Sequence, residues 1–342
     1  MTTLVIGASG FLGSHVVRRL VESDDDVRVL VRATSDTRAI DDLDVDRVVG
    51  ELTDADTVRT AMTGCDAVFY CAVDTRAWLT DPTPLYRTNV DALRAVLDVA
   101  VDAELRSFVF TSTAATIGSA GPRAARRVAT EADDFDWVDT APDYVRTRVA
   151  AENLVLEYSS KHGLPAVAMC VSNTYGAGDW QPTPHGAFVA GAALGKLPFT
   201  VRGCRAESVG IDDAAEALIL AADRGRPGER YIVSESFIDL GDIIATAAAA
   251  AGRRAPRLVL HRPVLYLCGA VGSLLAKVTG TPRQLTISSV RLMHYMPPMD
   301  HGKATRELGW RPTPVSEAVA FGARFWVERV AQRRAARPDG PS

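Results

Sequence analysis

Lysine is scarce in this sequence, and cysteine occurs only as scattered single residues. Four lysines are present, so 34 of the 38 basic residues are arginine. The cysteines form no CxxC pair, which argues against a disulfide framework or a metal site and fits a reducing compartment, so we expect a cytoplasmic protein. The five cysteines are Cys65, Cys71, Cys170, Cys204 and Cys268.

Neither an excess of positive charge nor a long apolar run is present. The net charge of −4 argues against a nucleic-acid partner. An apolar run meets a glycine within the first seven residues, so we expect no signal peptide. The longest nearly uncharged stretch, 263–276, is too short to be a transmembrane segment. The apolar fraction of 47% is that of an ordinary globular protein.

Short apolar runs alternate with helix-like stretches over the first 110 residues and again further along. This alternation predicts an α/β fold with a Rossmann-type, doubly wound parallel sheet. Strands are expected at 4–6, 27–31, 47–49, 67–70, 107–110, 166–171 and 231–233. Helices are expected at 11–22, 54–62, 86–101, 144–161, 211–223 and 241–251.

Three parts of the chain are expected to differ in role. Residues 1–176, with a return segment near 206–233, are predicted to form a dinucleotide-binding domain. Residues 177–330 are predicted to form mainly a smaller C-terminal substrate-binding domain. Residues 331–342 are basic and contain proline and glycine, so a flexible tail is expected.

A glycine-rich loop directly follows the first expected strand and opens the first helix. Its sequence is Gly7-Ala8-Ser9-Gly10-Phe11-Leu12-Gly13. Glycines at these places allow a tight turn, a close approach of the backbone to a pyrophosphate, and close packing of helix on strand. The strand–turn–helix context therefore predicts dinucleotide binding.

The end of the second strand favours NADP(H) over NAD(H). Arg32 stands there, with Ser35 and Arg38 close behind, and an arginine at this place accommodates a 2′-phosphate. The acidic residues 24–26 precede the strand and lie at the wrong end to meet the ribose. The alternative is that Arg32 is one surface charge among many in an arginine-rich protein.

Several further motifs resemble those of the extended short-chain dehydrogenase/reductase family, the NAD-dependent epimerase/dehydratase superfamily. Glu51-Leu52 occupies the position of the family's adenine-contacting pair, and Cys71-Ala72-Val73 that of the segment after its fourth strand. Residues 170–176 occupy the position of its RPxNVYG motif. The stretches 29–37, 182–184 and 228–231 are similar to the branch of the dihydroflavonol reductases. That branch includes hopanoid-associated sugar epimerases and borders the 3β-hydroxysteroid dehydrogenases. The resemblance implies an enzyme and a homodimer.

The resemblance also assigns site residues. Tyr144 takes the place of the general acid/base and Thr113 that of the catalytic hydroxyl, with Ser112 as the alternative. Arg148 stands where the family has lysine, and Val171 where it usually has proline. The cofactor contacts that the resemblance and the loop imply are Gly7, Ser9, Gly10, Phe11, Leu12, Gly13, Arg32, Ser35, Glu51, Leu52, Cys71, Ala72, Val73, Thr111, Tyr144, Arg148, Val171 and Asn173.

The arginine at position 148 has two interpretations. It lies four residues after Tyr144, on the same helix face, so its charge can lower the pKa of the phenol. It cannot give up a proton, so a relay through lysine would be interrupted. Either the change is drift in an arginine-rich protein, or the hydride chemistry is altered or lost.

The substrate is expected to be an apolar small molecule. Ala206 and Gly210 replace the arginine and histidine with which sugar-nucleotide relatives meet a diphosphate, although Arg202 and Arg205 lie nearby. The candidate substrate contacts are Asp74, Trp78, Tyr175, Trp180 and His185. The apolar stretch 264–278 is either a buried core helix or a surface for a lipid-like substrate or peripheral membrane contact.

The resulting functional prediction is an NAD(P)-dependent oxidoreductase acting on a ketone or secondary alcohol of a terpenoid, steroid, polyketide or flavanone-like molecule. Two alternatives stay open. One is a sugar epimerase or dehydratase with transient oxidation, and the other is a redox-inactive NADP-binding protein.

Overall fold

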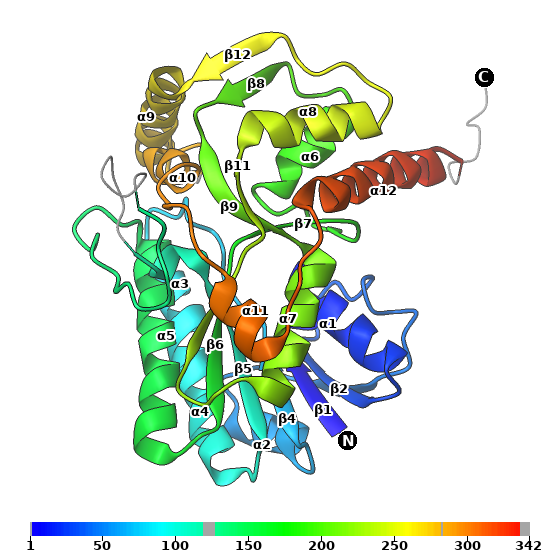
Figure 1. Cartoon of the computed structure of the whole chain (residues 1–342), viewed down its shortest axis with the longest axis vertical. Helices are drawn as coiled ribbons and strands as arrows, with labels where there is room; N and C mark the ends of the chain where they lie inside the picture. Colours follow the sequence, from blue (N-terminus) through cyan, green and yellow to red (C-terminus); the bar gives the residue numbers. More distant parts are fainter. Residues whose placement is uncertain (1, 119–126, 282, 336–342) are drawn as a thin grey trace.

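A seven-stranded, entirely parallel sheet forms the larger part of the molecule in the computed structural model, which describes residues 2–118, 127–281 and 283–335 (Figure 1). The strand order is β10-β6-β5-β4-β1-β2-β3. The strands are β1 (Thr2–Ile6), β2 (Asp26–Val31), β3 (Asp46–Val49), β4 (Ala67–Tyr70), β5 (Ser107–Thr113), β6 (Ala166–Val171) and β10 (Arg230–Val233). The predicted Rossmann-type fold class is confirmed.

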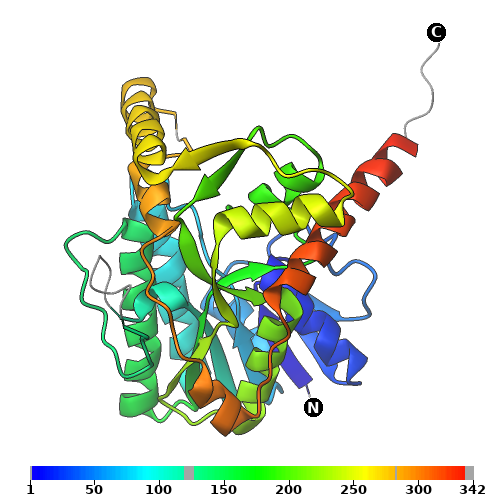
Figure 2. The ribbon, with the colours of Figure 1, turned by 45° about the horizontal axis from the view of Figure 1, so that its top comes forward.

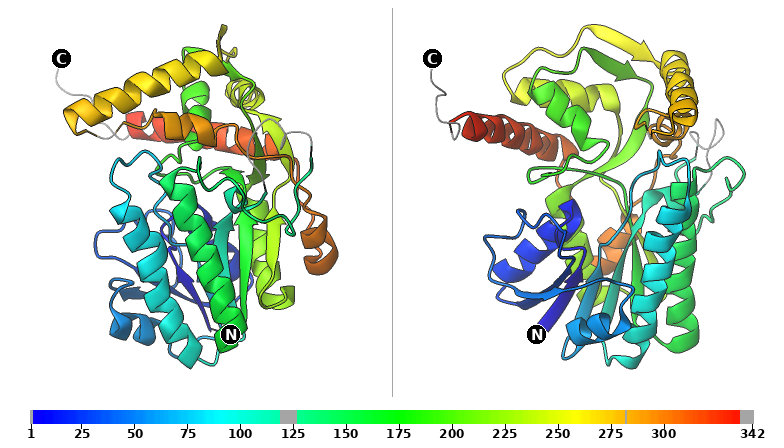
Figure 3. Two further views of the ribbon diagram at one scale, coloured as in Figure 1. Left: turned by 90° about the vertical axis from the view of Figure 1, so that its left-hand side faces the viewer. Right: turned by 180° about the vertical axis from the view of Figure 1, so that it is seen from behind.

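Helices cover both faces of this sheet, which is why its central strands are apolar on both sides. On one face α1 (Phe11–Glu22) and α7 (Ile211–Arg224) pack over β1, β2 and β6. On the other face α2 (Ala55–Met62), α4 (Ala92–Asp102) and α5 (Asp143–His162) form a second apolar core (Figure 3).

The helix expected at 86–101 begins earlier and contains an irregular turn. It starts with α3 (Thr83–Tyr86), passes through a π-turn at Arg87–Asp91 and continues as α4. The π-turn carries Asn89, whose buried side chain bonds to Asp74 and Thr147, so the irregular turn places an amide beside the site.

The smaller domain lies above the carboxyl edge of the sheet (Figures 1 and 2). A three-stranded sheet joins β7 (Asn173–Tyr175), β9 (Arg205–Gly210) and β11 (Ser236–Asp239), and β8 (Phe199–Arg202) pairs with β12 (Leu258–His261). The helices of this region are α6 (Gly186–Ala193), α8 (Leu240–Ala250), α9 (Arg262–Thr279), α10 (Ile287–Leu292) and α12 (Val315–Ala335).

Two shorter helices complete the described chain. The 3₁₀ turn η2 (Ala114–Thr116) follows β5, and α11 (Gly302–Leu308) packs near β10 and α7. Residues 331–335, expected in a flexible tail, continue α12, and the rest of that expected tail lies outside the described residues.

Candidate active site

The glycine loop joins β1 to α1 in the geometry that a bound pyrophosphate requires. Gly7 has φ +84°, and a Cβ there would lie 2.6 Å from the Ala72 nitrogen. A Cβ on Gly13 would lie 2.3 Å from the Gly7 oxygen, so helix and strand approach as only glycine allows. Gly10 is exposed and precedes the first helical turn, whose N–H groups have no helical partner. This cradle fits a dinucleotide.

The loop after β2 carries two arginines in different settings. Arg32 is exposed at the end of the strand and forms no ion pair among the described residues. Its backbone N–H donates to Ser35 Oγ at 3.2 Å, which shapes the turn. Arg38 instead pairs with Asp36 and lies 5.6 Å from the centre of the Trp180 ring. Arg32 is therefore the cation at this strand end that stays available to a ligand.

The carboxyl ends of neighbouring strands gather the remaining expected cofactor contacts at one edge. Thr111 Oγ1 donates to Cys71 Sγ at 3.3 Å and so connects the ends of β5 and β4. Leu52 is half-buried against the core, whereas Glu51 and Val73 are exposed. The others at this edge are Cys71, Ala72, Val171 at the end of β6 and Asn173 at the start of β7.

Two adjacent hydroxyls at the end of β5 have different surroundings, because successive strand residues point to opposite faces. Ser112 is buried and donates to the buried carboxylate of Glu152, which also accepts from Thr116 Oγ1 at 2.8 Å. Thr113 is half-buried, and its Oγ1 accepts from the Ala115 N–H at 3.3 Å. Of the two hydroxyls, Thr113 is the one that is accessible from the site.

Tyr144 and Arg148 lie one turn apart near the start of α5. Arg148 is buried, with its guanidinium 5.0 Å from the centre of the Phe110 ring and its Nη2 donating to the Thr111 carbonyl. Its Nη1 has no partner among the described residues. The arginine is thus anchored to β5 by one nitrogen and keeps another free beside the tyrosine.

Burial and charge act on Tyr144 in opposite directions. Burial raises the pKa of its phenol above the ordinary value, the charge of Arg148 lowers it, and the carboxylate of Asp74 raises it further. Burial also lowers the pKa of Arg148, and the nearby Tyr144 partly opposes this. The guanidinium remains a cation, since arginine does not lose its proton in proteins.

An apolar wall lies beside Tyr144, and sequence reasoning missed it. Trp137, from the loop before α5, stacks on Tyr295 with ring centroids 4.9 Å apart. Tyr144 packs against the buried cluster that contains Trp137, and so do Leu292, Tyr295 and Met296. Leu292 ends α10 and Tyr295 and Met296 follow it, some 150 positions beyond Tyr144, so no local pattern links them to the tyrosine.

The five expected substrate contacts are not brought together at one place. Asp74 is buried, its carboxylate accepts from Arg76 Nε at 2.8 Å, and its backbone is bonded to the Asn89 side chain. Tyr175 is buried in the core of the smaller domain, 5.3 Å from the His185 ring. Burial lowers the pKa of His185 to about 4. Trp78 is half-buried in the loop after β4.

Trp180 is held from two directions. Arg38 lies on its ring from the loop after β2, and Arg329 of α12 lies 4.9 Å from the ring centre. Arg329 also donates to the Trp180 carbonyl at 2.9 Å, and Gln181 donates to Asp36 at 3.3 Å. Trp180 therefore joins the two domains instead of pointing freely into a pocket.

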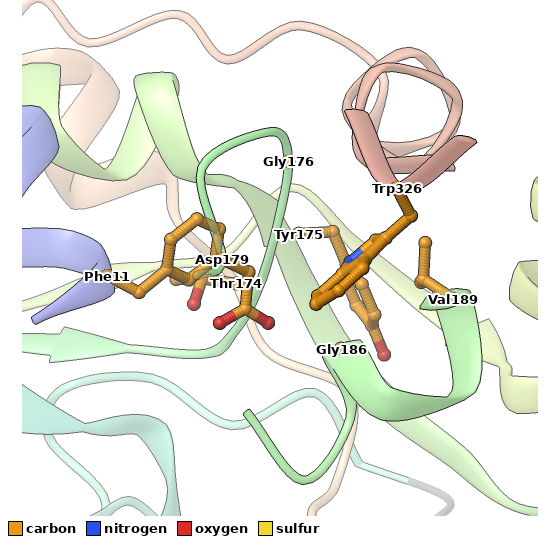
Figure 4. Close-up of a pocket in the computed structure, with 8 residues that line it drawn as sticks. All are labelled: Phe11, Thr174, Tyr175, Gly176, Asp179, Gly186, Val189 and Trp326. Carbon is orange, nitrogen blue, oxygen red and sulfur yellow. The ribbon is translucent and has the colours of Figure 1, made fainter. Parts of the chain in front are cut away.

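A small pocket lies where the glycine loop meets the loop after β7 (Figure 4). Asp179 enters it next to Phe11, and Trp326 extends into it from α12. Burial raises the pKa of Asp179 to about 6, although bonds from Thr183 oppose this. Asp179 and Trp326 were not among the expected site residues. The lining consists of Phe11, Thr174, Tyr175, Gly176, Asp179, Gly186, Val189 and Trp326.

The cradle at Gly7, the parallel sheet and the Tyr144–Arg148 pair define the class as a Rossmann-type protein for a nicotinamide dinucleotide. The chain belongs to the NAD dependent epimerase/dehydratase family, whose model matches residues 3–234. The resemblance seen in the sequence is thereby confirmed. Proteins of this family are generally enzymes and bind a nicotinamide cofactor.

Similar proteins include reductases and epimerases. The chain is 29% identical over 332 residues to sterol demethylase protein B of Methylococcus capsulatus, covering 96% of this chain and 99% of that protein. It is 30% identical over 330 residues to a putative dihydroflavonol 4-reductase of Synechocystis, covering 94% and 93%. The fold matches Thermus thermophilus UDP-glucose 4-epimerase in complex with NAD, with a TM-score of 0.76 at 21% identity and coverage of 96% and 99%.

Proposed function

We propose that this protein is an NADP(H)-dependent oxidoreductase that reduces a ketone or oxidises a secondary alcohol of a hydrophobic small molecule. The apolar wall of Trp137, Leu292, Tyr295 and Met296 beside Tyr144 carries this proposal. An apolar substrate gains free energy by leaving water for such a wall, whereas a sugar would leave its hydroxyls there without partners.

The chain's own residues account for binding of the cofactor. The backbone around Gly10 and the first turn of α1 would hold the pyrophosphate, and the carboxyl ends of β4 to β6 would flank the nicotinamide. When bound, the nicotinamide supplies or accepts the hydride. Arg32, which is unpaired among the described residues, would meet a 2′-phosphate, so we propose a preference for NADP(H).

Each polar side chain then has a defined task. The raised pKa keeps Tyr144 protonated at neutral pH, ready to donate a proton to a carbonyl oxygen and to take it back in the reverse direction. Thr113 Oγ1 would donate to the same oxygen and stabilise its developing negative charge. Arg148 would hold positive charge beside the phenol and offer its free Nη1 to a ribose hydroxyl.

Two observations support an apolar substrate over a nucleotide sugar. The names of the two relatives refer to a sterol and to a dihydroflavonol. The second observation concerns Arg205, which lies near the position where sugar-nucleotide relatives contact the diphosphate. Its guanidinium is 4.6 Å from the centre of the Phe237 ring and donates to the Phe237 carbonyl at 2.8 Å. A diphosphate would have to compete with these contacts.

The second candidate is a sugar epimerase or dehydratase with transient oxidation. The likeness to UDP-glucose 4-epimerase and the family itself favour it, because the same tyrosine would serve that reaction. The third, a redox-inactive NADP-binding protein, rests on Arg148 alone. A cytoplasmic homodimer is part of the leading proposal on family likeness.

A scan of steroid, terpenoid and flavanone ketones for NADPH oxidation tests the proposal. We expect net loss of NADPH absorbance with at least one ketone, and its loss in the Tyr144→Phe variant. Conversion of UDP-glucose to UDP-galactose without net NADPH consumption would instead establish the epimerase. Tight NADPH binding without either reaction would support the inactive protein.

A further inference from the structure

Helix α9 has two apolar faces, of which only one is covered. Leu265, Gly269 and Ala276 are buried on the inner face. A Cβ on Gly272 would lie 2.0 Å from the Leu285 oxygen, so the inner face is packed tightly against the segment that leads into α10. The expectation of a buried core helix therefore holds for the inner face alone.

The outer face is an apolar stripe exposed along the whole helix. Its residues recur at spacings of three and four, which places them on one side of a helix. They are Val264 (43% exposed), Leu267 (66%), Val271 (51%), Leu274 (62%), Leu275 (43%) and Val278 (75%). Figures 1 and 3 show α9 at the outer edge of the molecule. A continuous apolar stripe of this kind marks an interaction surface.

The charge around the stripe has one sign. No Asp or Glu occurs from 243 to 299, although the whole chain has a net charge of −4. The same stretch holds seven cations, and none of them forms an ion pair among the described residues. They are Arg253, Arg254, Arg257, Arg262, Lys277, Arg283 and Arg291. Two of these cations, Arg262 and Lys277, lie on α9 itself, and Arg283 follows the helix in the chain.

We propose that the outer face of α9 docks on an anionic lipid bilayer, with the helix lying in the interface. Apolar residues on one side and cations around them are what an interfacial helix needs. No described helix is long and apolar enough to cross a membrane, so the contact is peripheral.

The same charge argues against a second copy of this chain as the occupant. A symmetric contact through α9 would bring Arg262 and Lys277 of one molecule against those of the other, and α9 has no acid to pair with them. A lipid surface with negative headgroups removes that repulsion instead.

Co-sedimentation of the full-length protein with vesicles tests the proposal. One set of vesicles mixes phosphatidylcholine with phosphatidylglycerol, and the other is phosphatidylcholine alone. We expect binding to the mixed vesicles, weakened by salt, and much weaker binding to the neutral ones.

Variants distinguish vesicle binding through the stripe from nonspecific adsorption of the protein. Leu267→Ser with Leu274→Ser should lower the partition coefficient at least about tenfold, because two exposed leucines lose their place in the bilayer. Phe321→Ser removes a comparably exposed apolar residue from α12 and should change nothing. Lys277→Glu with Arg283→Glu should weaken binding to the mixed vesicles and leave binding to the neutral vesicles unchanged. Thermal unfolding checks that each variant is folded.

Two results would overturn the proposal. The first is equal vesicle binding by the wild type and the double leucine variant. The second is absence of binding to the mixed vesicles. A dimer that the double leucine variant converts to a monomer in sedimentation would then assign the stripe to a second copy. Neither result depends on the ketone reaction. The proposed function and the proposed membrane surface can therefore be contradicted independently of each other.

Discussion

Arg148 donates from Nη2 to the backbone carbonyl of Thr111, two residues before the hydroxyl proposed to contact the substrate. The helix with the proton donor and the strand with the second hydroxyl are therefore joined by the residue that departs from the family pattern. A lysine ammonium could not both cover the Phe110 ring and make this bond with the same planar geometry.

Removal of the charge at position 148 should shift the pH profile. The Arg148 charge lowers the pKa of Tyr144, so Arg148→Met should raise that pKa and move the alkaline limb of kcat for ketone reduction to higher pH. We expect kcat at neutral pH to fall at least about tenfold as well, since a fixed positive charge at the site is lost. Arg148→Lys should keep the limb near its wild-type position. An alkaline limb that does not move in Arg148→Met would place the arginine outside the reaction.

The two hydroxyls of β5 should respond differently to removal. Thr113→Val should lower kcat by roughly 10²-fold or more while leaving the melting temperature nearly unchanged, because its hydroxyl is accessible. Ser112→Ala should cost about 1–3 kcal/mol of stability, because the buried carboxylate of Glu152 loses a donor. Steady-state kinetics and thermal unfolding on both variants make the comparison. The reverse pattern would transfer the catalytic role to Ser112.

The cofactor preference should depend on Arg32 and not on Arg38. Arg32→Ala should weaken NADPH binding at least about tenfold and leave NADH binding unchanged, because a charge-assisted bond to the 2′-phosphate is worth about 1.5–3 kcal/mol. Arg38→Ala is the matched control, since Arg38 is paired with Asp36. Titration calorimetry with both nucleotides measures the affinities of the wild type and the two variants. Equal affinity of the wild type for NADPH and NADH would contradict this assignment.

A buried carboxyl should make stability depend on pH. Glu207 of β9 is 2% exposed and accepts from Ser234 Oγ and from the Met299 N–H at 2.7 Å. Burial raises its pKa to about 7 from the ordinary 4.5. A raised folded-state pKa means that its contribution to stability is fully present below pH 4.5 and is lost as the pH rises to about 7.

Glu207→Gln tests this dependence, because glutamine keeps an acceptor for Met299 and cannot ionise. Between those pH values the variant should gain on the order of 3 kcal/mol relative to the wild type. Denaturant unfolding of both proteins over this range measures the difference. A difference that is independent of pH would show that Glu207 titrates normally in the folded state.

The sequence predicted those parts of the fold and site whose signals are local. The glycine loop from Gly7 to Gly13 needs a turn, a close backbone approach and a helix start within seven residues, so its pattern is visible in a short window. The spacing of Tyr144 and Arg148 is likewise contained in one helix turn. Strand–helix alternation sufficed for the parallel sheet.

Contacts between distant parts of the chain were not predictable in this way. Ser112 meets Glu152 only because β5 lies against α5. Tyr295 reaches the wall beside Tyr144 from beyond α10. Asp74 follows β4 in the sequence, but its ties to Asn89 through the backbone and to Arg76 through the carboxylate appear only in the structure. Such pairings follow from packing, which a pattern along the chain does not encode.

The position of Trp180 has a kinetic consequence. With Arg38 on its ring from one domain and Arg329 bound to its ring and its carbonyl from the other, the loop that carries it cannot swing outward alone. Any opening must break contacts to both domains within one event. Outward movement of the loop therefore has an energetic barrier, to which these cation–ring contacts and the bond between Arg329 and the Trp180 carbonyl contribute.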